Sequence, residues 1–213
     1  SFVNVTPPLL HAGIDLAIFD HDQNALLWSR RLAYRWQQAK DPKTGLSGGQ
    51  LSYREHDRAK DALGQVYPNI NEAKIAASYH QTERYHELPL AQMQSAVKLL
   101  DQGPEYAALG RDLIQWARQD LAIYTEQCFD PKKGVFDAKM TDGTPIDWTK
   151  AKEGYYNENS FAPAKPAGDL LWGFAMAYRL SKDPFDWDMA RKMMKLMELG
   201  DLGEIDGDAD GLN

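Results

Sequence analysis

Arginine, lysine and tyrosine side chains gather in one polar stretch of the chain. Arg54 and Arg58 lie in it and Lys74 follows it, with Tyr53 and Tyr67 nearby in sequence. An arginine fork can hold a carboxylate through two hydrogen bonds, and a lysine attracts it as a point charge. A flat aromatic ring can lie against the face of a sugar. The group therefore fits a binding site for an acidic carbohydrate, and the alternative is a solvated connection between helices.

Two other groups carry metal-ligand residue types without the matching spacing. Residues 206–211 read DGDADG, which is the first half of a calcium loop, but no closing glutamate follows before residue 213. His80 and His86 lie six positions apart, whereas two ligands on one helix face lie four apart. We therefore expect a solvated acidic loop and polar histidines, and we assign no metal ligand. The chain also has no Gly-x-Ser-x-Gly, P-loop or Rossmann glycine motif.

Composition limits the partners. The net charge of −7 disfavours broad binding to a nucleic-acid backbone, although a local basic cleft can sit on an acidic protein. No apolar run reaches the length of a membrane span, and the single Cys128 excludes an internal disulfide. We expect neither a nucleic acid nor a membrane as a partner. With 213 residues, 43% of them hydrophobic, the chain can form one substantial domain.

One sequence pattern, an apolar helical stretch that stops near Asp-Pro, recurs along the chain and predicts its architecture. Apolar stretches at helical spacing stop near Asp41-Pro42, Asp130-Pro131 and Asp183-Pro184, because proline cannot continue a helix and restricts the residue before it. Recurring helical units favour a mainly α fold of stacked hairpins, either a solenoid or a closed ring. The uneven spacing favours the ring. Thr6 is expected to cap the first helix and Asp22 the second.

The other expected elements are assigned from local pattern. Helices are predicted from Asn71 through Tyr79, over 89–100, from Pro104 onward, over 169–180 and over 187–199. A β-hairpin is predicted over 135–146 because Asp142-Gly143 favours a tight turn. Residues 41–70 and 149–167 are expected to be long polar loops, which are unusual inside a compact domain and often functional.

Several runs of the sequence resemble polysaccharide lyase family 2, the bacterial helical-barrel pectate lyases. They are residues 3–13 (VNVTPPLLHAG), 39–50 (AKDPKTGLSGGQ), 56–60 (HDRAK) and 140–144 (MTDGT). The resemblance extends over most of the chain. It implies an α/α toroid, a barrel of helical hairpins, and we expect residues 1–213 to be part of one such catalytic domain, truncated at both ends.

The resemblance also implies a reaction, which is cleavage of polygalacturonate by metal-assisted β-elimination. A base removes the proton beside the uronate carboxylate, and the glycosidic oxygen leaves. The family uses a divalent metal, Mn²⁺ or Ca²⁺, held by His and Glu, with an arginine as base, and we expect these residues N-terminal to residue 1. We therefore assign no catalytic residue. Lys74, Arg54, Arg58 and Tyr53 are the predicted binding residues for polygalacturonate or oligogalacturonides.

Two alternatives remain open at this point. The chain could be a helical-repeat scaffold whose loops bind a partner without chemistry, or a toroid glycoside hydrolase that uses a pair of aspartates. The compartment implied is bacterial, either periplasm or cytoplasm. Ultraviolet absorbance of an unsaturated product separates the lyase from both alternatives.

Overall fold

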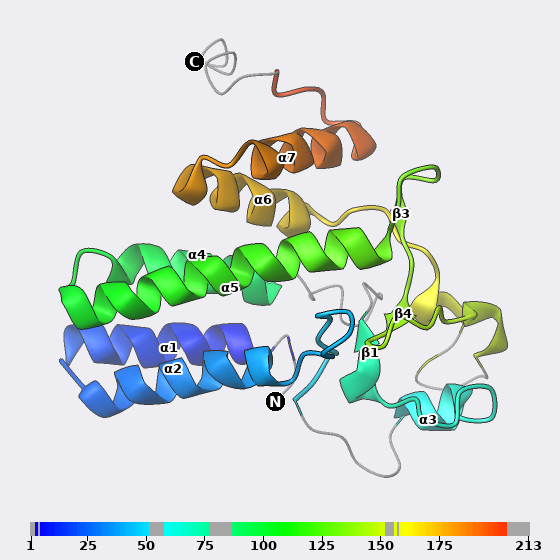
Figure 1. Cartoon of the computed structure of the whole chain (residues 1–213), viewed down its shortest axis with the longest axis horizontal. Coiled ribbons are helices and arrows are strands. Elements are labelled where there is room, and N and C mark those ends of the chain that lie inside the picture. The colour runs from blue at the N-terminus through cyan, green and yellow to red at the C-terminus, as the bar shows by residue number, and fades with distance from the viewer. Residues whose placement is uncertain are drawn as a thin grey trace.

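The computed structural model describes residues 3, 5–51, 58–76, 87–151, 156 and 158–203, and in them the chain is mainly helical. Six helices form three antiparallel hairpins (Figure 1). Their bounds are α1 (Thr6–Phe19) with α2 (Gln23–Gln38), α4 (Glu87–Leu99) with α5 (Pro104–Cys128), and α6 (Gly168–Ser181) with α7 (Pro184–Leu196). The predicted fold class, mainly α with a small amount of strand, is confirmed.

The hairpins stack side by side. Helix α4 packs against both α1 and α6, so the first helices of the three hairpins form a continuous layer. Helices α2 and α5 also meet, and Figure 1 shows α7 on the far side of α6. This is the packing expected of stacked helical units. Closure of the stack into a toroid remains a prediction.

Apolar stripes on the helices create the main core. On α5 the buried side chains recur every three or four residues, which places them on one face of the helix. They pack against α6 and α7 around the fully buried Phe174. The members of the stripe in this cluster are Ala117, Leu121, Tyr124 and Cys128. The same helix therefore joins the second hairpin to the third.

The starts of the first two helices differ from each other. The carboxylate of Asp22 accepts hydrogen bonds from the amides of Asn24 (2.8 Å) and Ala25 (3.2 Å), so its predicted cap is confirmed. The predicted cap at Thr6 is wrong. Thr6 lies within α1, and its hydroxyl accepts a hydrogen bond from the indole N–H of the buried Trp36 (3.1 Å). A buried indole needs an acceptor, and Thr6 supplies it.

The Asp-Pro pairs lie where predicted, just beyond the ends of α2, α5 and α6. The third pair also begins a helix. Lys182 adopts a left-handed conformation after α6, and the carboxylate of Asp183 accepts from the amide of Phe185 (3.0 Å) to cap α7. Pro184 takes the first helical position, where a missing amide hydrogen costs nothing. One Asp-Pro pair can therefore end one helix and start the next.

Short strands lie beyond one end of the helices, and β1 (Ile75–Ala76) and β4 (Lys139–Met140) among them lie near α3 (Arg58–Leu63) (Figure 1). Strand β1 pairs antiparallel with β4, and β2 (Phe129–Asp130) pairs antiparallel with β3 (Val135–Phe136). The predicted hairpin turn is present, because Gly143 has a φ of +91° and its amide donates to the carbonyl of Met140 (2.9 Å). Its ladder is short, with one bridge between Lys139 and Pro145.

The predicted helix from Asn71 through Tyr79 is wrong in its described part. Residues Glu72–Lys74 form a single 3-10 turn, η1, and the chain then extends into β1. The apolar residues Ile75 and Ala76 are both buried, so they fit an extended segment that is covered on both faces. Residues 77–86 lie outside the described part of the chain.

A second core lies under the loops. Ile75, Met140, Tyr156 and Phe161 are buried together with α3, and the rings of Tyr156 and Phe161 lie 5.3 Å apart. The expectation that residues 149–167 form only a surface loop is therefore wrong, because the buried Tyr156 and Phe161 come from that segment. These aromatic side chains belong to a hydrophobic cluster that is separate from the main core.

Candidate functional site

The first Asp-Pro turn closes on itself. The carboxylate of Asp41 accepts from the amides of Lys43 (2.9 Å) and Thr44 (3.3 Å), and the amide of Gly45 donates to the carbonyl of Asp41 (2.8 Å). Gly45 has a φ of +77°, a left-handed conformation that glycine adopts at low cost. The turn therefore has a fixed shape that depends on its own residues.

The second Asp-Pro turn repeats this geometry. The carboxylate of Asp130 accepts from the amides of Lys132 (2.9 Å) and Lys133 (3.2 Å), and Gly134 donates to the carbonyl of Asp130 (2.9 Å). Gly134 has a φ of +67°. The sequence echo between residues 41–45 and 130–134 thus corresponds to one local structure used twice.

The Asp41 turn lies against the turn around Gly143. The hydroxyl of Thr44 donates to the carbonyl of Thr141 and also accepts from the amide of Leu46 (3.1 Å). The amide of Thr141 donates in turn to the carbonyl of Lys74 (2.8 Å). Three segments that are far apart in sequence are therefore joined at one place, which holds Lys43, Lys74 and Asp142.

Two lysines flank one carboxylate at this junction. Asp142 is exposed and accepts from the amide of Thr144 (2.9 Å). Hydrogen bonds from Thr144 lower the pKa of Asp142, and the charges of Lys43 and Lys74 lower it further. The carboxylate is therefore ionised at neutral pH. It offsets part of the charge of the two lysines, whose exposed ammonium groups are the cations here that can attract an anionic ligand.

Lys74 is positioned by its neighbours on both sides. It ends η1, its side chain is exposed, and its carbonyl accepts from Thr141. Glu72 begins the same 3-10 turn. Its buried carboxylate accepts from the Gln50 side-chain amide (3.1 Å) and from the Tyr156 hydroxyl (2.9 Å). Sequence reasoning did not single out Glu72, because its two partners come from distant segments and leave no local signal.

Arg58 lies on a neighbouring element. It is exposed at the start of α3, and it has an electrostatic or hydrogen-bonding partner. Helix α3 packs against η1 through its buried face, which carries Ala59, Ala62 and Leu63. The structure therefore places Arg58 and Lys74 on two packed elements of the same small unit. The other two predicted binding residues, Tyr53 and Arg54, lie outside the described residues.

No metal centre is found in the part of the chain that the structure describes, where no group of three or more His, Cys, Asp or Glu side chains could hold an ion. These residues therefore do not fit a divalent-metal site. The calcium-like run at 206–211 and the histidines His56, His80 and His86 lie outside the described ranges. His11 is half-buried, and its Nδ1 lies 3.2 Å from the hydroxyl of Ser95, as expected for a packed histidine with a partner.

Comparison with protein families identifies the class. The fold is a stack of helical hairpins that carries a polar, lysine-bearing junction beyond one end of its helices. The family model described as periplasmic pectate lyase matches residues 1–213, and the chain belongs to that family. This confirms the resemblance drawn from the sequence. None of the described helices is both long and apolar enough to cross a membrane.

Proposed function

We propose that this chain is part of an enzyme that cleaves polygalacturonate by β-elimination. Membership in the periplasmic pectate lyase family is the observation that carries the proposal. In such a reaction a base takes the proton from the carbon that bears the carboxylate. A carbon–carbon double bond forms next to that carboxylate, and the glycosidic oxygen leaves with the departing sugar.

The junction around Lys74 is proposed to bind uronate carboxylates next to the bond that breaks. Polygalacturonate carries a carboxylate on every sugar, so binding requires fixed positive charges. Lys43 and Lys74 supply two, held on turns that are both hydrogen-bonded to Thr141, and Arg58 supplies a third on the adjoining helix. Charge-assisted hydrogen bonds of this kind contribute roughly 1.5–3 kcal/mol each.

The proposed cofactor is a divalent cation, Mn²⁺ or Ca²⁺. The described residues contain no group that would ligate it. We therefore place its ligands, and the catalytic base, elsewhere in the protein. The role proposed for Lys74, Lys43 and Arg58 is to bind and orient the polymer.

The proposal is tested with the complete reading frame that contains this chain. Polygalacturonate is added with Mn²⁺ or with Ca²⁺, and ultraviolet absorbance is followed together with new reducing ends. A lyase raises both signals, because every cleavage creates a conjugated double bond. New reducing ends without absorbance would identify a hydrolase. Binding without either signal would identify a scaffold.

A further inference from the structure

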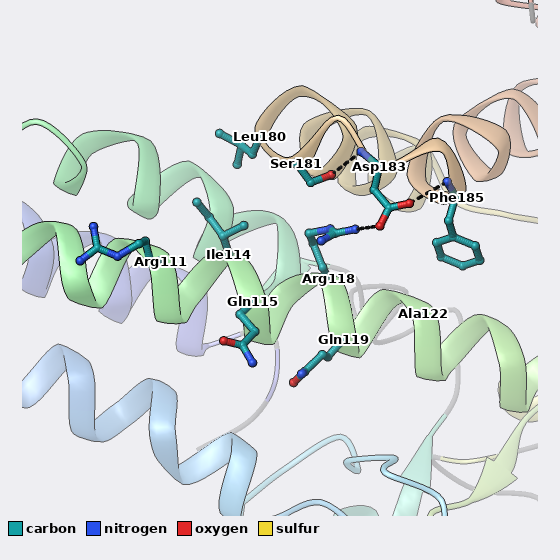
Figure 2. Close-up of a pocket in the computed structure, with 10 residues that line it drawn as sticks. All are labelled: Arg111, Ile114, Gln115, Arg118, Gln119, Ala122, Leu180, Ser181, Asp183 and Phe185. Carbon is teal, nitrogen blue, oxygen red and sulfur yellow. Dashed lines mark hydrogen bonds and ion pairs between the residues drawn. The ribbon is translucent and has the colours of Figure 1, made fainter. Parts of the chain in front are cut away.

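A hollow lies on the opposite side of α5 from the first hairpin, where α5 meets the corner between α6 and α7 (Figure 2). Its volume is about 630 Å³. This is within the range of small-ligand sites in proteins, roughly 300–1,000 Å³. The junction around Lys74 contributes no residue to its lining, so the hollow is a different place on the molecule.

One wall of the hollow is held by an ion-pair network. The guanidinium of Arg118 donates to the carboxylates of Asp183 (2.6 Å) and Asp186 (2.7 Å). The hydroxyl of Ser181 donates to Asp186 (2.8 Å) and accepts from the amide of Asp183 (3.0 Å). Asp186 is 1% exposed, so this pairing is shielded from solvent on one side. The network joins the α6–α7 corner to α5 and gives the wall a fixed shape.

The remaining lining residues offer three kinds of contact. Arg111 is exposed at one end and forms no ion pair with any described residue. The exposed amides of Gln115 and Gln119 follow at intervals of four residues, along the lower margin in Figure 2. Phe185, 44% exposed, lies at the other end, with its ring edge-to-face on the buried Phe174 at 6.3 Å.

This combination matches the chemistry of an acidic oligosaccharide. An amide can donate to one sugar hydroxyl and accept from another. An aromatic ring can cover the apolar face of a sugar, and an unpaired arginine can hold a carboxylate. From Arg111 to Gln119 the helix rises about 12 Å, which is longer than one sugar ring. Arg118 carries one positive charge against the two carboxylates of Asp183 and Asp186, so these three groups together have a charge of −1. Arg111 brings the sum to zero and is the lining cation left to hold a carboxylate of the ligand.

We propose that this hollow is an accessory binding site for an oligogalacturonide segment, separate from the junction around Lys74. The inference rests on the proposed function, because it takes the ligand to be the same acidic polymer. Such a site holds a distant part of a long chain. It therefore strengthens the binding of polymer through multivalency and leaves the chemistry unchanged.

The test uses the complete protein with 4-fluorophenylalanine incorporated at position Phe185. Fluorine NMR then reports on the hollow alone while trigalacturonate is added, and cellotriose serves as the neutral control. The expected result is a saturable shift with trigalacturonate only. Arg111→Gln should weaken this titration roughly three- to tenfold. Arg31→Gln, on the exposed surface of α2, should leave it unchanged.

The outcomes separate the two proposals. No shift, or an equal shift with cellotriose, overturns the accessory site, and so does a titration that Arg111→Gln leaves unchanged. Ultraviolet absorbance of the same samples shows whether the ligand has been cleaved. A saturable shift in a protein that never forms unsaturated product supports the hollow and contradicts the lyase. Product formation without a fluorine shift supports the lyase and contradicts the accessory site.

Discussion

The backbone amide of Thr141 donates to the backbone carbonyl of Lys74 over 2.8 Å, and this contact fixes where the lysine lies. It joins the β-turn at 140–144 to η1, so the ammonium group and the carboxylate of Asp142 share one junction. A main-chain contact does not depend on the side chain at position 74. The lysine can therefore be replaced without taking the junction apart.

Lys74→Ala should raise KM for polygalacturonate about tenfold and leave kcat nearly unchanged. The lysine is proposed to contact the substrate equally in the ground and transition states, so its loss affects binding alone. Steady-state rates from ultraviolet absorbance measure both constants. Lys132→Ala, in the matching Asp130 turn, is the control and should change neither. An unchanged KM for Lys74→Ala would show that the junction is only a solvated connection.

Glu72→Gln should destabilise the protein by about 1–3 kcal/mol. Both carboxylate oxygens accept hydrogen bonds, one from Gln50 and one from Tyr156, and an amide keeps only one of these acceptors. The charge is also lost, so the two hydrogen bonds become neutral and weaker. Urea unfolding followed by circular dichroism measures the change. Glu126→Gln on the exposed surface of α5 should be close to neutral. Equal stability of the two variants would contradict a structural role for Glu72.

Gly48→Ala should destabilise the loop by about 1–3 kcal/mol, because a Cβ at this position would overlap the backbone carbonyl of Ala73. The neighbouring amide of Gly49 donates to the carbonyl of Ile75 (3.0 Å), so the segment cannot easily move away. Thermal unfolding tests this. Gly168→Ala is the control, because nothing lies within 4 Å of its added Cβ. The prediction fails if both variants melt at the same temperature.

Asp183 should contribute to stability at neutral pH and lose that contribution in acid. Its hydrogen bond from the amide of Phe185 lowers its pKa, and Arg118 lowers it further. A carboxyl whose folded pKa is depressed stabilises the protein above its unfolded pKa of about 3.9. That stability is lost as the pH falls through the folded pKa. Asp183→Asn should therefore be less stable than the parent at pH 7, and the difference should shrink below about pH 4.

Melting temperatures of the parent and Asp183→Asn across this range provide the measurement. Asp188→Asn, at an exposed position on the same helix, is the matched control. A difference between the parent and Asp183→Asn that stays constant from pH 7 to pH 2 would rule out the ionic contribution.

Cys128 should resist alkylation in the native protein. It is 1% exposed, and burial raises the pKa of its thiol to about 12, so almost no thiolate is present at pH 8. Iodoacetamide labelling followed by mass spectrometry should detect modification in urea and almost none without it. Rapid labelling under native conditions would mean that the end of α5 opens readily.

Local signals in the sequence predicted most of the helices and only part of the junction. Helix α3 lies inside residues 41–70, which were expected to be a loop, and α7 begins at Pro184 rather than at residue 187. Asp22, the Asp-Pro pairs and Gly143 act through residues within a few positions of themselves, so pattern alone predicted their helix and turn boundaries. The β1–β4 pairing joins residues far apart in the chain, so it leaves no local signal. The two apolar residues of β1, Ile75 and Ala76, fit a helical pattern as well as a strand. Lys74 was predicted as a binding residue from its residue type. Its proximity to Lys43 and Asp142 depends on tertiary packing.

The self-closed Asp41 turn has a consequence for how this architecture can change over evolutionary time. Asp41 accepts hydrogen bonds from Lys43, Thr44 and Gly45, so the turn that follows α2 is fixed before the long connection begins. Insertions and deletions in the connection that leave the packed residues 46–50 in place then cause little disturbance in the helical stack. Related proteins can therefore change the length or the charge of the connection, and with it the polymer that they bind, while they keep the same helical stack.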